Sequence, residues 1–429
     1  MTINYSRPEI HEIEKFVLPS YERRYLDNGI PIYVLHSNEP DIFKLEIIFK
    51  AGRYYESEKA VAKITAGLLK EGSLNYSSAE IARRIDFLGA SVVTGSGMDY
   101  AFIQAHFLGK YFNELIEIIS EFIFHPLFDE RELSKFKNRQ IERLKVELSK
   151  NEVLAYRYLT EHIYGKDHPY GYSTEIQNYN VVTRDQIVDH YSKYYNSEQC
   201  KIFITGNLSD ERYRVINDTF SLMRKYSSLI SVNPYKSNDP ETGKFVYQND
   251  RMFQSSIRLG KKIFNRHHSD YPSLYLLNTI LGGYFGARLS ANIREDKGYT
   301  YGIYSALEMM EHDGYFLIST DVGNEYLEQT LIEINNELKG LRDKKVPHKE
   351  LNLVKNYIKG YMLSAINGNF NTLNLIKILE LAELNLDYFT KFIDKISSFT
   401  PSDLIETANK YFIDEEMTIV LVGSNENQL

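Results

Sequence analysis

Histidine and glutamate are the residues of this chain that could hold a metal ion, but their spacing gives little support for that role. His11 and Glu14 form a His-x-x-Glu pattern, yet Lys15 follows where a second histidine would be needed to bind zinc from one helical face. Two further histidine pairs stand in turns or polar segments, His162 with His168 and His267 with His268. We predict that these histidines lie at the surface or in hydrogen bonds rather than on a metal.

The single cysteine and one lysine are candidates for nucleophilic chemistry. Cys200 lies in an apolar run over residues 200–205, and Lys201 is the only adjacent basic residue that would lower its pKa. A lone cysteine forms no internal disulfide, so a buried structural thiol is predicted over a reactive one. Nothing around Lys63 indicates the desolvation that Schiff-base chemistry needs, and a solvated lysine is expected there.

The elements that position these residues occur as two copies. Residues 183–206 and 400–423 align without a gap at an offset of 217, about half of the 429-residue chain. Each copy begins with a threonine helix-start signal, continues as an amphipathic helix and ends in a buried strand closed by glycine, Gly206 or Gly423. A chance match of a common helix–strand pattern is the alternative, but the halfway offset favours a duplicated domain.

A segment rich in turn-forming residues, 231–243, separates the halves and is typical of a linker. We therefore expect an N-terminal domain over residues 1–230 and a homologous C-terminal domain over residues 240–429. In the first half, strands are predicted over 29–35, 43–49, 90–93 and 101–106, and helices over 61–69, 78–87 and 112–123. Because helices and strands mix without strict alternation, the fold class is α+β, each domain a mainly antiparallel sheet with helices packed on one face.

Composition restricts the function classes. The formal net charge of −8 and the pI near 5.8 argue against binding to nucleic acid or to an anionic membrane, because both bind basic protein surfaces. The first residues have no apolar signal region, and no stretch reaches the roughly 18 apolar residues of a membrane span. We expect a soluble cytoplasmic protein that uses neither nucleic acid nor a membrane.

Several motifs resemble the pitrilysin/insulinase family of metallopeptidases, and the resemblance covers essentially the whole chain. They occupy residues 26–34, 49–56, 60–73, 125–128, 164–171 and 281–289. The internal duplication is itself a property of that family.

The resemblance implies a zinc site that this chain has lost. Catalytic members carry His-x-x-Glu-His on the helix that here runs through residues 60–70, in which two histidines bind zinc and the glutamate polarises water. The corresponding positions are Lys63, Ala66 and Gly67, and the third zinc ligand, a later glutamate, corresponds to Leu144, 77 residues after Gly67. Two nearby glutamates, Glu142 and Glu147, leave a shift of three residues open. The resemblance therefore implies that this chain binds no metal or other cofactor.

A second signature of the family is present. In such proteins an arginine and a tyrosine seven residues later reach from the second half toward a zinc site, and they correspond to Arg294 and Tyr301. A guanidinium binds carbonyls or carboxylates of a peptide, and a phenol donates to a developing oxyanion. The alternative is that Arg294 is a helix-end cation before Gly298 and Tyr301 a sheet residue.

Together these features predict the non-catalytic subunit of a heterodimeric zinc metallopeptidase, inactive alone. Its partner would be a zinc-bearing subunit of the same family, and the pair would enclose unfolded peptides in a chamber, with Arg294 and Tyr301 acting in trans. Two alternatives stay open. The chain is a self-associating structural or peptide-binding pseudo-peptidase, or it is a peptidase with an unrecognised site.

Overall fold

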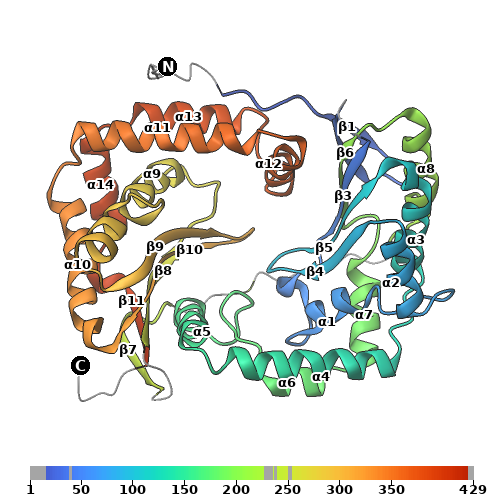
Figure 1. Ribbon diagram of the computed structural model, residues 1–429, viewed down its shortest axis with the longest axis horizontal. Coiled ribbons are helices and arrows are strands. Elements are labelled where there is room, and N and C mark those ends of the chain that lie inside the picture. Colours follow the sequence, from blue (N-terminus) through green and yellow to red (C-terminus); the bar gives the residue numbers. More distant parts are fainter. Residues whose placement is uncertain (1–15, 38–40, 227–234, 236–238, 250–253, 424–429) are drawn as a thin grey trace, which may run out of the picture.

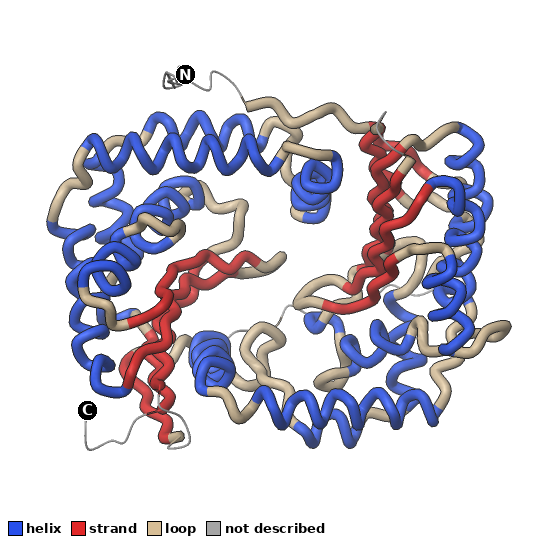
Figure 2. Tube along the Cα trace, viewed as in Figure 1, coloured by secondary structure: helices blue, strands red, loops and turns tan. Residues whose placement is uncertain are grey.

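Two sheets lie on opposite sides of the molecule, each with its own layer of helices on the outer side (Figure 1). The computed structural model describes residues 16–37, 41–226, 235, 239–249 and 254–423. Figure 2 shows the same arrangement, with the strands between outer helices and a few helices placed toward the centre. The α+β architecture predicted from the sequence is confirmed.

The first sheet has the strand order β1-β2-β6-β3-β5-β4. Its strands are β1 Glu22–Tyr25, β2 Pro31–His36, β3 Ile42–Phe49, β4 Ser91–Ser96, β5 Ala101–Leu108 and β6 Cys200–Gly206. β2 pairs with β6 in parallel, and the other neighbours pair antiparallel. All but the first residue of β3 are buried, so both faces of this central strand are covered.

The second sheet repeats this order as β7-β11-β8-β10-β9. Its strands are β7 Gly243–Gln248, β8 Gln254–Ile263, β9 Thr300–Met309, β10 Gly314–Gly323 and β11 Thr418–Gly423. β7 and β11 pair in parallel, as β2 and β6 do. The duplication predicted from the 217-residue offset is therefore confirmed.

The repeated residues perform the same local task in both copies. Thr183 and Thr400 each close a capping box at the start of α7 Arg184–Tyr194 and α14 Pro401–Tyr411. Gly206 and Gly423 end β6 and β11 with φ of +145° and +143°, a conformation that residues with a Cβ rarely adopt. Both glycines end equivalent strands, as expected.

Helices lie outside each sheet, some packed on its outer face and others packed on those helices. In the first half they are α1 Val61–Leu68, α2 Ser78–Phe87, α3 Phe112–Phe124, α4 Glu130–Glu147, α6 Ile176–Val181, α7 and α8 Asp210–Phe220. In the second half they are α9 Tyr271–Gly282, α10 Leu327–Asp343, α11 His348–Ala365, α13 Tyr388–Ser398 and α14. No helix among the described residues combines the length and the apolar character that crossing a bilayer requires.

Two further helices are exchanged between the halves (Figure 1). α5 Asn151–Tyr164, from the first half, packs on β8 and β11 of the second sheet, whereas α12 Asn369–Leu381, from the second half, packs on β2 and β6 of the first. Leu159 of α5 is buried with Val420, and Ile376 of α12 is buried with Phe203. The exchange explains why side chains on the inner sheet faces are buried.

The predicted elements correspond closely to those observed. The helix predicted over 78–87 is α2 with the same bounds, and the strands predicted over 43–49 and 101–106 are β3 and β5, each extended by one or two residues. Most of the predicted linker over 231–243 lies outside the described residues, and the boundaries at 230 and 240 stay a prediction.

Candidate functional site

The four positions that correspond to zinc-site residues lie on two helices that pack together. Lys63, Ala66 and Gly67 lie on α1, and Leu144 lies on α4, which contacts α1. Ala66 is fully buried and Leu144 is nearly so. None of these side chains offers an imidazole or a carboxylate, so none supplies a zinc ligand.

The space beside Gly67 is occupied by the ring of Phe136 from α4. A Cβ added to Gly67 would lie 2.3 Å from Cζ of Phe136, far closer than two carbon atoms approach. A histidine at residue 67 would therefore collide with this ring. The residues present do not fit a zinc ion, and the packing of α4 on α1 depends on having no side chain at this position.

The glutamates near Leu144 are paired with basic residues of their own helix. Nζ of Lys145 lies 2.7 Å from Glu142, and Nε of Arg143 lies 2.8 Å from Glu147. Glu142 is exposed, whereas Leu144 points into the packed interior. Glu142 and Glu147 lie two and three residues from Leu144. Glu142 is exposed and Glu147 is paired with Arg143, so neither takes the buried position of Leu144.

Lys63 lies at the mouth of a small cavity of about 210 Å³ that Leu144 also lines. Its Nζ donates to the hydroxyl of Tyr179, 3.0 Å away. The ammonium is on the exposed side of α1. The solvated lysine expected from the sequence is what the structure shows.

Arg294 lies in a π-helical turn, Ser290–Asp296, that leads through the Gly298 turn into β9. Its guanidinium lies 3.7 Å from the ring centroid of Phe285 and 2.5 Å from the Glu295 carboxylate. Nε of Arg294 is buried without a hydrogen-bond partner among the described residues. Short π-helical segments occur often at functional sites. This one carries Arg294, whose guanidinium has a donor without a hydrogen-bond partner among the described residues.

This turn is anchored by acidic residues of the outer helices. Asn292 donates to Glu333 and Glu337 of α10 at 3.0 and 2.9 Å. Arg288 makes two hydrogen bonds of 2.8 Å with Glu350 of α11. A bidentate arginine–carboxylate pair fixes geometry as well as adding energy, so the segment before Arg294 is held firmly.

Tyr301 follows on the edge strand β9, and its side chain is 96% exposed. A large aromatic residue on a strand normally packs against its neighbours, and this one has no hydrogen bond or ring contact with a described residue. An ordinary sheet residue of this size would be partly covered by its neighbours, so the exposure of Tyr301 speaks against that alternative.

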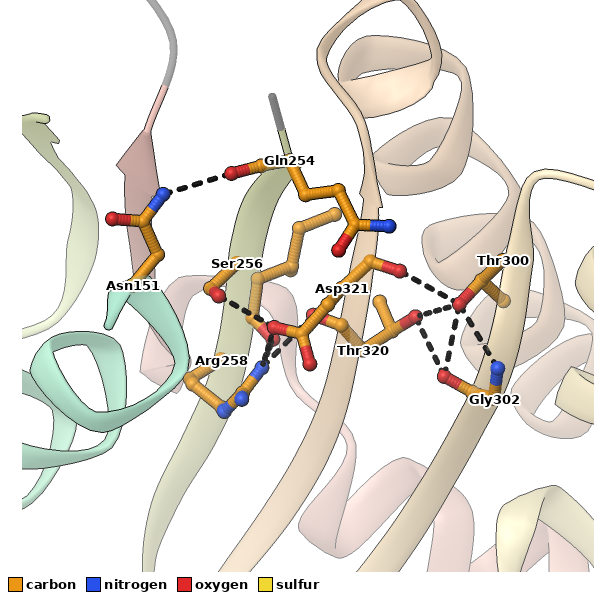
Figure 3. A network of polar contacts seen from close by, with 9 residues as sticks. Asn151, Gln254, Ser256, Arg258, Thr300, Gly302, Thr320 and Asp321 are labelled. Carbon is orange, nitrogen blue, oxygen red and sulfur yellow. Dashed lines mark hydrogen bonds and ion pairs between the residues drawn. The ribbon is translucent and has the colours of Figure 1, made fainter. Parts of the chain in front are cut away.

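The backbone around Tyr301 is braced by a polar network (Figure 3). Oγ1 of Thr300 donates to the carbonyl of Asp321 at 2.8 Å, and Oγ1 of Thr320 lies 3.0 Å from Oγ1 of Thr300. The β9–β10 register shifts between Thr320 and Val322, so Asp321 lies in a bulge. Bulges re-aim side chains at sheet edges, and this one lies beside the strand segment that carries Tyr301.

The bulge is held from the neighbouring strand by a buried arginine (Figure 3). Nη1 of Arg258 donates to the carbonyl of Thr320 at 2.8 Å and lies 3.2 Å from the Asp321 carboxylate, which also accepts from Ser256. Sequence reasoning missed this network. The signal was present as two polar residues, Ser256 and Arg258, on alternate positions of the strand, both of them buried.

The histidines singled out in the sequence serve structural roles where they are described. His162 contacts Glu241 and Tyr247 and stacks on Phe245, and His268 stacks on Phe264. Burial lowers the pKa of His168 to about 4, so this ring is neutral near pH 7. His11 and Glu14 lie outside the described residues.

Cys200 is buried as predicted, and burial raises the pKa of its thiol well above the ordinary range. A group of possible metal ligands in the described part of the chain, Asp99, Glu311 and His312, lies between the two halves. There Lys50 pairs with Glu311, and Asp99 accepts from the Tyr170 hydroxyl. These contacts account for the Asp99 carboxylate and for one oxygen of Glu311, whose Oε2 is buried without a hydrogen bond among the described residues.

Comparisons with known proteins show the family of this fold. The family model described as "Insulinase (Peptidase family M16)" matches residues 33–174, and that described as "Peptidase M16 inactive domain" matches residues 182–358. An uncharacterized zinc protease of Bacillus subtilis, YmxG, is 26% identical over 354 residues, which cover 81% of this chain and 85% of that protein.

A relative from Helicobacter pylori described as "Non-peptidase homolog YmxG" is 20% identical over 359 residues, 77% of this chain and 81% of its own length. Among solved structures, a peptidase M16 inactive domain from Pseudomonas fluorescens superposes with a TM-score of 0.86 at 24% identity, covering 95% of this chain and 99% of that one. Both zinc proteases and a non-peptidase homologue are thus among the similar proteins.

Proposed function

This chain belongs to the M16 (insulinase) peptidase family, and we propose that it is the zinc-less subunit of a two-chain peptidase of that family. It would bind no zinc itself and would contribute Arg294 and Tyr301 to peptide held at the zinc of a partner chain. In this proposal the zinc-bearing partner is a second family member of similar size, and the substrate is an unfolded peptide.

The observation that carries the proposal is a contrast between the two half-sites. In the first half, Phe136 fills the space beside Gly67 that a zinc-binding histidine would need. In the second half, the network around Thr300 and Asp321 still holds an almost fully exposed Tyr301. A chain kept only for its fold has no reason to hold a large aromatic residue in solvent at a braced sheet edge.

The chemistry of the retained pair supports an action on peptide. The guanidinium of Arg294 can donate to a peptide carbonyl or carboxylate. The phenol of Tyr301 can donate to the oxyanion that forms when water attacks a peptide carbonyl. Neither group supplies the attacking water, so catalysis requires a metal site on another chain.

The test is co-expression with a family member that carries His-x-x-Glu-His, followed by size-exclusion chromatography and a peptide-cleavage assay. We expect one complex that cleaves peptide, and neither chain active alone. Homodimers of this chain, with no assembly or gain of activity on mixing, would instead support a self-associating pseudo-peptidase.

Variants of this chain then test its contribution to turnover in the complex. Arg294→Ala should lower kcat/KM by about tenfold or more, because a charge-assisted contact to substrate is lost. Tyr301→Phe should lower kcat by on the order of a hundredfold if the phenol donates to the oxyanion. Tyr304→Phe, a change at an exposed tyrosine on the same strand, is the matched control. Unchanged kinetics in both variants of an intact complex would contradict the proposal.

A further inference from the structure

The small cavity beside the former zinc position has an unusual charge for this chain. Four basic residues line it, Arg53, Lys63, Arg143 and Arg157, against one acidic residue, Glu147. Arg143 and Glu147 pair with each other, which leaves three cations around the cavity. In a chain with a net charge of −8, a local excess of this kind attracts an anion.

These three cations have no carboxylate partner. Among the described residues, no acidic oxygen lies within ion-pair distance of Arg53, Lys63 or Arg157. Their hydrogen bonds go to neutral oxygens instead, those of Tyr172 at 3.0 Å, Tyr179 at 3.0 Å and Thr174 at 2.8 Å respectively. Charged donors that bind neutral acceptors in a partly enclosed space keep most of their attraction for an anion.

The surrounding carboxylates offset the charge of Arg53 and Arg157 only in part. Burial raises the pKa of Glu56, a carboxyl group near Arg53, to about 7, so Glu56 is only partly ionised at neutral pH. Burial also lowers the pKa of both Arg53 and Arg157, and for Arg53 it outweighs the opposing attraction of Glu56. For Arg157 it outweighs the opposing attraction of Glu161 and Glu175. Arg53 stays charged in spite of this shift, because a guanidinium group keeps its proton near neutral pH.

A polar group in the cavity also lacks a partner. Oε1 of Gln140, on α4, is buried without a hydrogen bond among the described residues. A side-chain amide has both a donor end and an acceptor end, and its two ends can exchange by a flip. A bound group with oxygen and N–H atoms would satisfy it.

From these contacts we propose that the cavity binds the C-terminal carboxylate of a peptide. Its 210 Å³ is less than the roughly 300–1,000 Å³ of pockets that enclose drug-sized ligands, so it suits one terminal residue rather than a folded partner. Two guanidinium groups match the two oxygens of a carboxylate, and the Gln140 amide pairs with the last peptide group. The peptide as ligand rests on the proposed function.

In this arrangement the lost zinc site has become an anchor for peptide ends. A peptide held by its C-terminus at Lys63, Arg53 and Arg157 would be retained in the complex while a partner's zinc acts elsewhere on it. No bond forms or breaks in this cavity. Its effect is on affinity and on the direction in which peptides are bound.

Isothermal titration calorimetry on the purified full-length chain tests this site without any partner. Two unstructured peptides of the same sequence are compared, one with a free C-terminus and one with a C-terminal amide. We expect the free acid to bind at least about tenfold more tightly, as the loss of a charged hydrogen bond costs about that much. Equal affinity of the two peptides would overturn the proposal.

Variants locate the site. Lys63→Ala should weaken the binding of the free-acid peptide by about tenfold and leave the affinity for the amidated peptide unchanged. Arg157→Gln provides a second, independent variant if Lys63→Ala folds poorly. Lys145→Ala, at an exposed lysine on α4 that pairs with Glu142 outside the cavity, is the matched control. Loss of binding in the control alone, or no change in either cavity variant, would overturn the assignment.

Two further probes separate other anions from a peptide end. Inorganic phosphate that binds this cavity while the free-acid peptide does not would overturn the peptide assignment. An amidated peptide with an internal glutamate that binds as tightly as the free acid would overturn the assignment to the C-terminus.

The outcome is distinct from that of the proposed function. Failure of carboxylate binding beside an active complex that depends on Arg294 would refute this inference and leave the proposed function intact. Carboxylate-dependent binding by a chain that never forms an active complex would support a peptide-binding pseudo-peptidase.

Discussion

At the scale of single residues, the positions that correspond to the family's zinc motif take part in helix packing. Gly67 has no side chain, and the ring of Phe136 takes the space. Phe136 is itself almost fully buried, so the contact belongs to the core between α1 and α4. The glycine at this position is thus coupled to a second residue, Phe136, that the motif alone does not reveal.

Gly67→Ala should destabilise the protein even though alanine favours helices. Overpacking against Phe136 costs about 1–3 kcal/mol and outweighs a helix-propensity gain of about 1 kcal/mol, so the free energy of unfolding should fall by about 1 kcal/mol. Urea unfolding measures it. Gly360→Ala in α11, where a Cβ meets no atom within 4 Å, should raise the same free energy.

The double variant Gly67→Ala with Phe136→Leu checks the cause, because removing the ring should let the alanine stabilise the helix. A double-mutant cycle without coupling between the two positions would contradict the packing explanation.

Restoring the zinc motif on α1 should not restore zinc. A variant with Lys63→His, Ala66→Glu and Gly67→His gains two imidazoles, but Leu144 supplies no third ligand and Phe136 blocks residue 67. Elemental analysis after dialysis should find well below one zinc per chain, both in this variant and in the parent chain. Adding Leu144→Glu and Phe136→Ala should increase the zinc content. Stoichiometric zinc in the parent chain would contradict the zinc-less assignment.

At the scale of elements, the sequence predicted what local periodicity controls. α2 was predicted with its observed bounds, and the repeat identified α7 with β6 and α14 with β11. The exchange of α5 and α12 was not predicted, because an amphipathic helix has the same pattern whichever sheet it covers. The contact of Phe136 with Gly67 and the bulge at Asp321 depend on residues that are distant in the sequence. They therefore produce no periodic pattern of apolar residues that could predict them.

The exchanged helix α12 is attached to the first sheet by buried charges. Glu46 of β3 is 2% exposed and accepts from Lys377 of α12, and Nζ of Lys44 lies 2.7 Å from Glu46. Burial disfavours ionisation of Glu46, but the two ammonium groups outweigh it and lower its pKa. Lys44 also donates to Asn374 of α12 at 2.7 Å. The pairing therefore depends on both halves of the chain.

Glu46→Gln should destabilise the protein by about 3–5 kcal/mol, because it leaves the Lys44 ammonium buried beside a neutral amide. Glu142→Gln, which breaks an exposed pair with Lys145, should cost at most about 1 kcal/mol. Chemical denaturation of both variants measures the difference. A similar small loss in both would show that α12 is held by its apolar contacts alone.

At the scale of the whole molecule, the two halves also meet through the tips of their hairpins. Oδ2 of Asp99, beside the β4–β5 turn, accepts from the backbone N–H of Glu311 at 2.9 Å, and Tyr54 stacks on His312 at 4.1 Å. Tyr55 joins the buried cluster between the halves and packs against Tyr194. The junction combines aromatic rings with charged groups, and its contacts join the two halves of the fold.

Acidification should unfold the protein partly through His190, which lies beneath this junction against Tyr194. Its ring is 2% exposed, Nε2 lies 3.2 Å from the Ala51 carbonyl oxygen, and burial lowers the pKa from 6.5 to about 4. A base with a lowered folded-state pKa binds fewer protons than in the unfolded chain. Its stabilisation is therefore complete above pH 6.5 and lost as the pH falls toward 4.

His190→Gln should remove this dependence, because a glutamine amide can still donate to Ala51 but does not titrate. Between pH 7 and pH 5 the parent chain should lose about 2 kcal/mol more unfolding free energy than the variant, from about 1.5 pH units at about 1.4 kcal/mol each. Urea midpoints at the two pH values measure the loss, with His267→Gln at an exposed ring as control. Equal losses in parent and variant would mean that His190 takes up no proton as the chain unfolds, and that other groups set the acid limit.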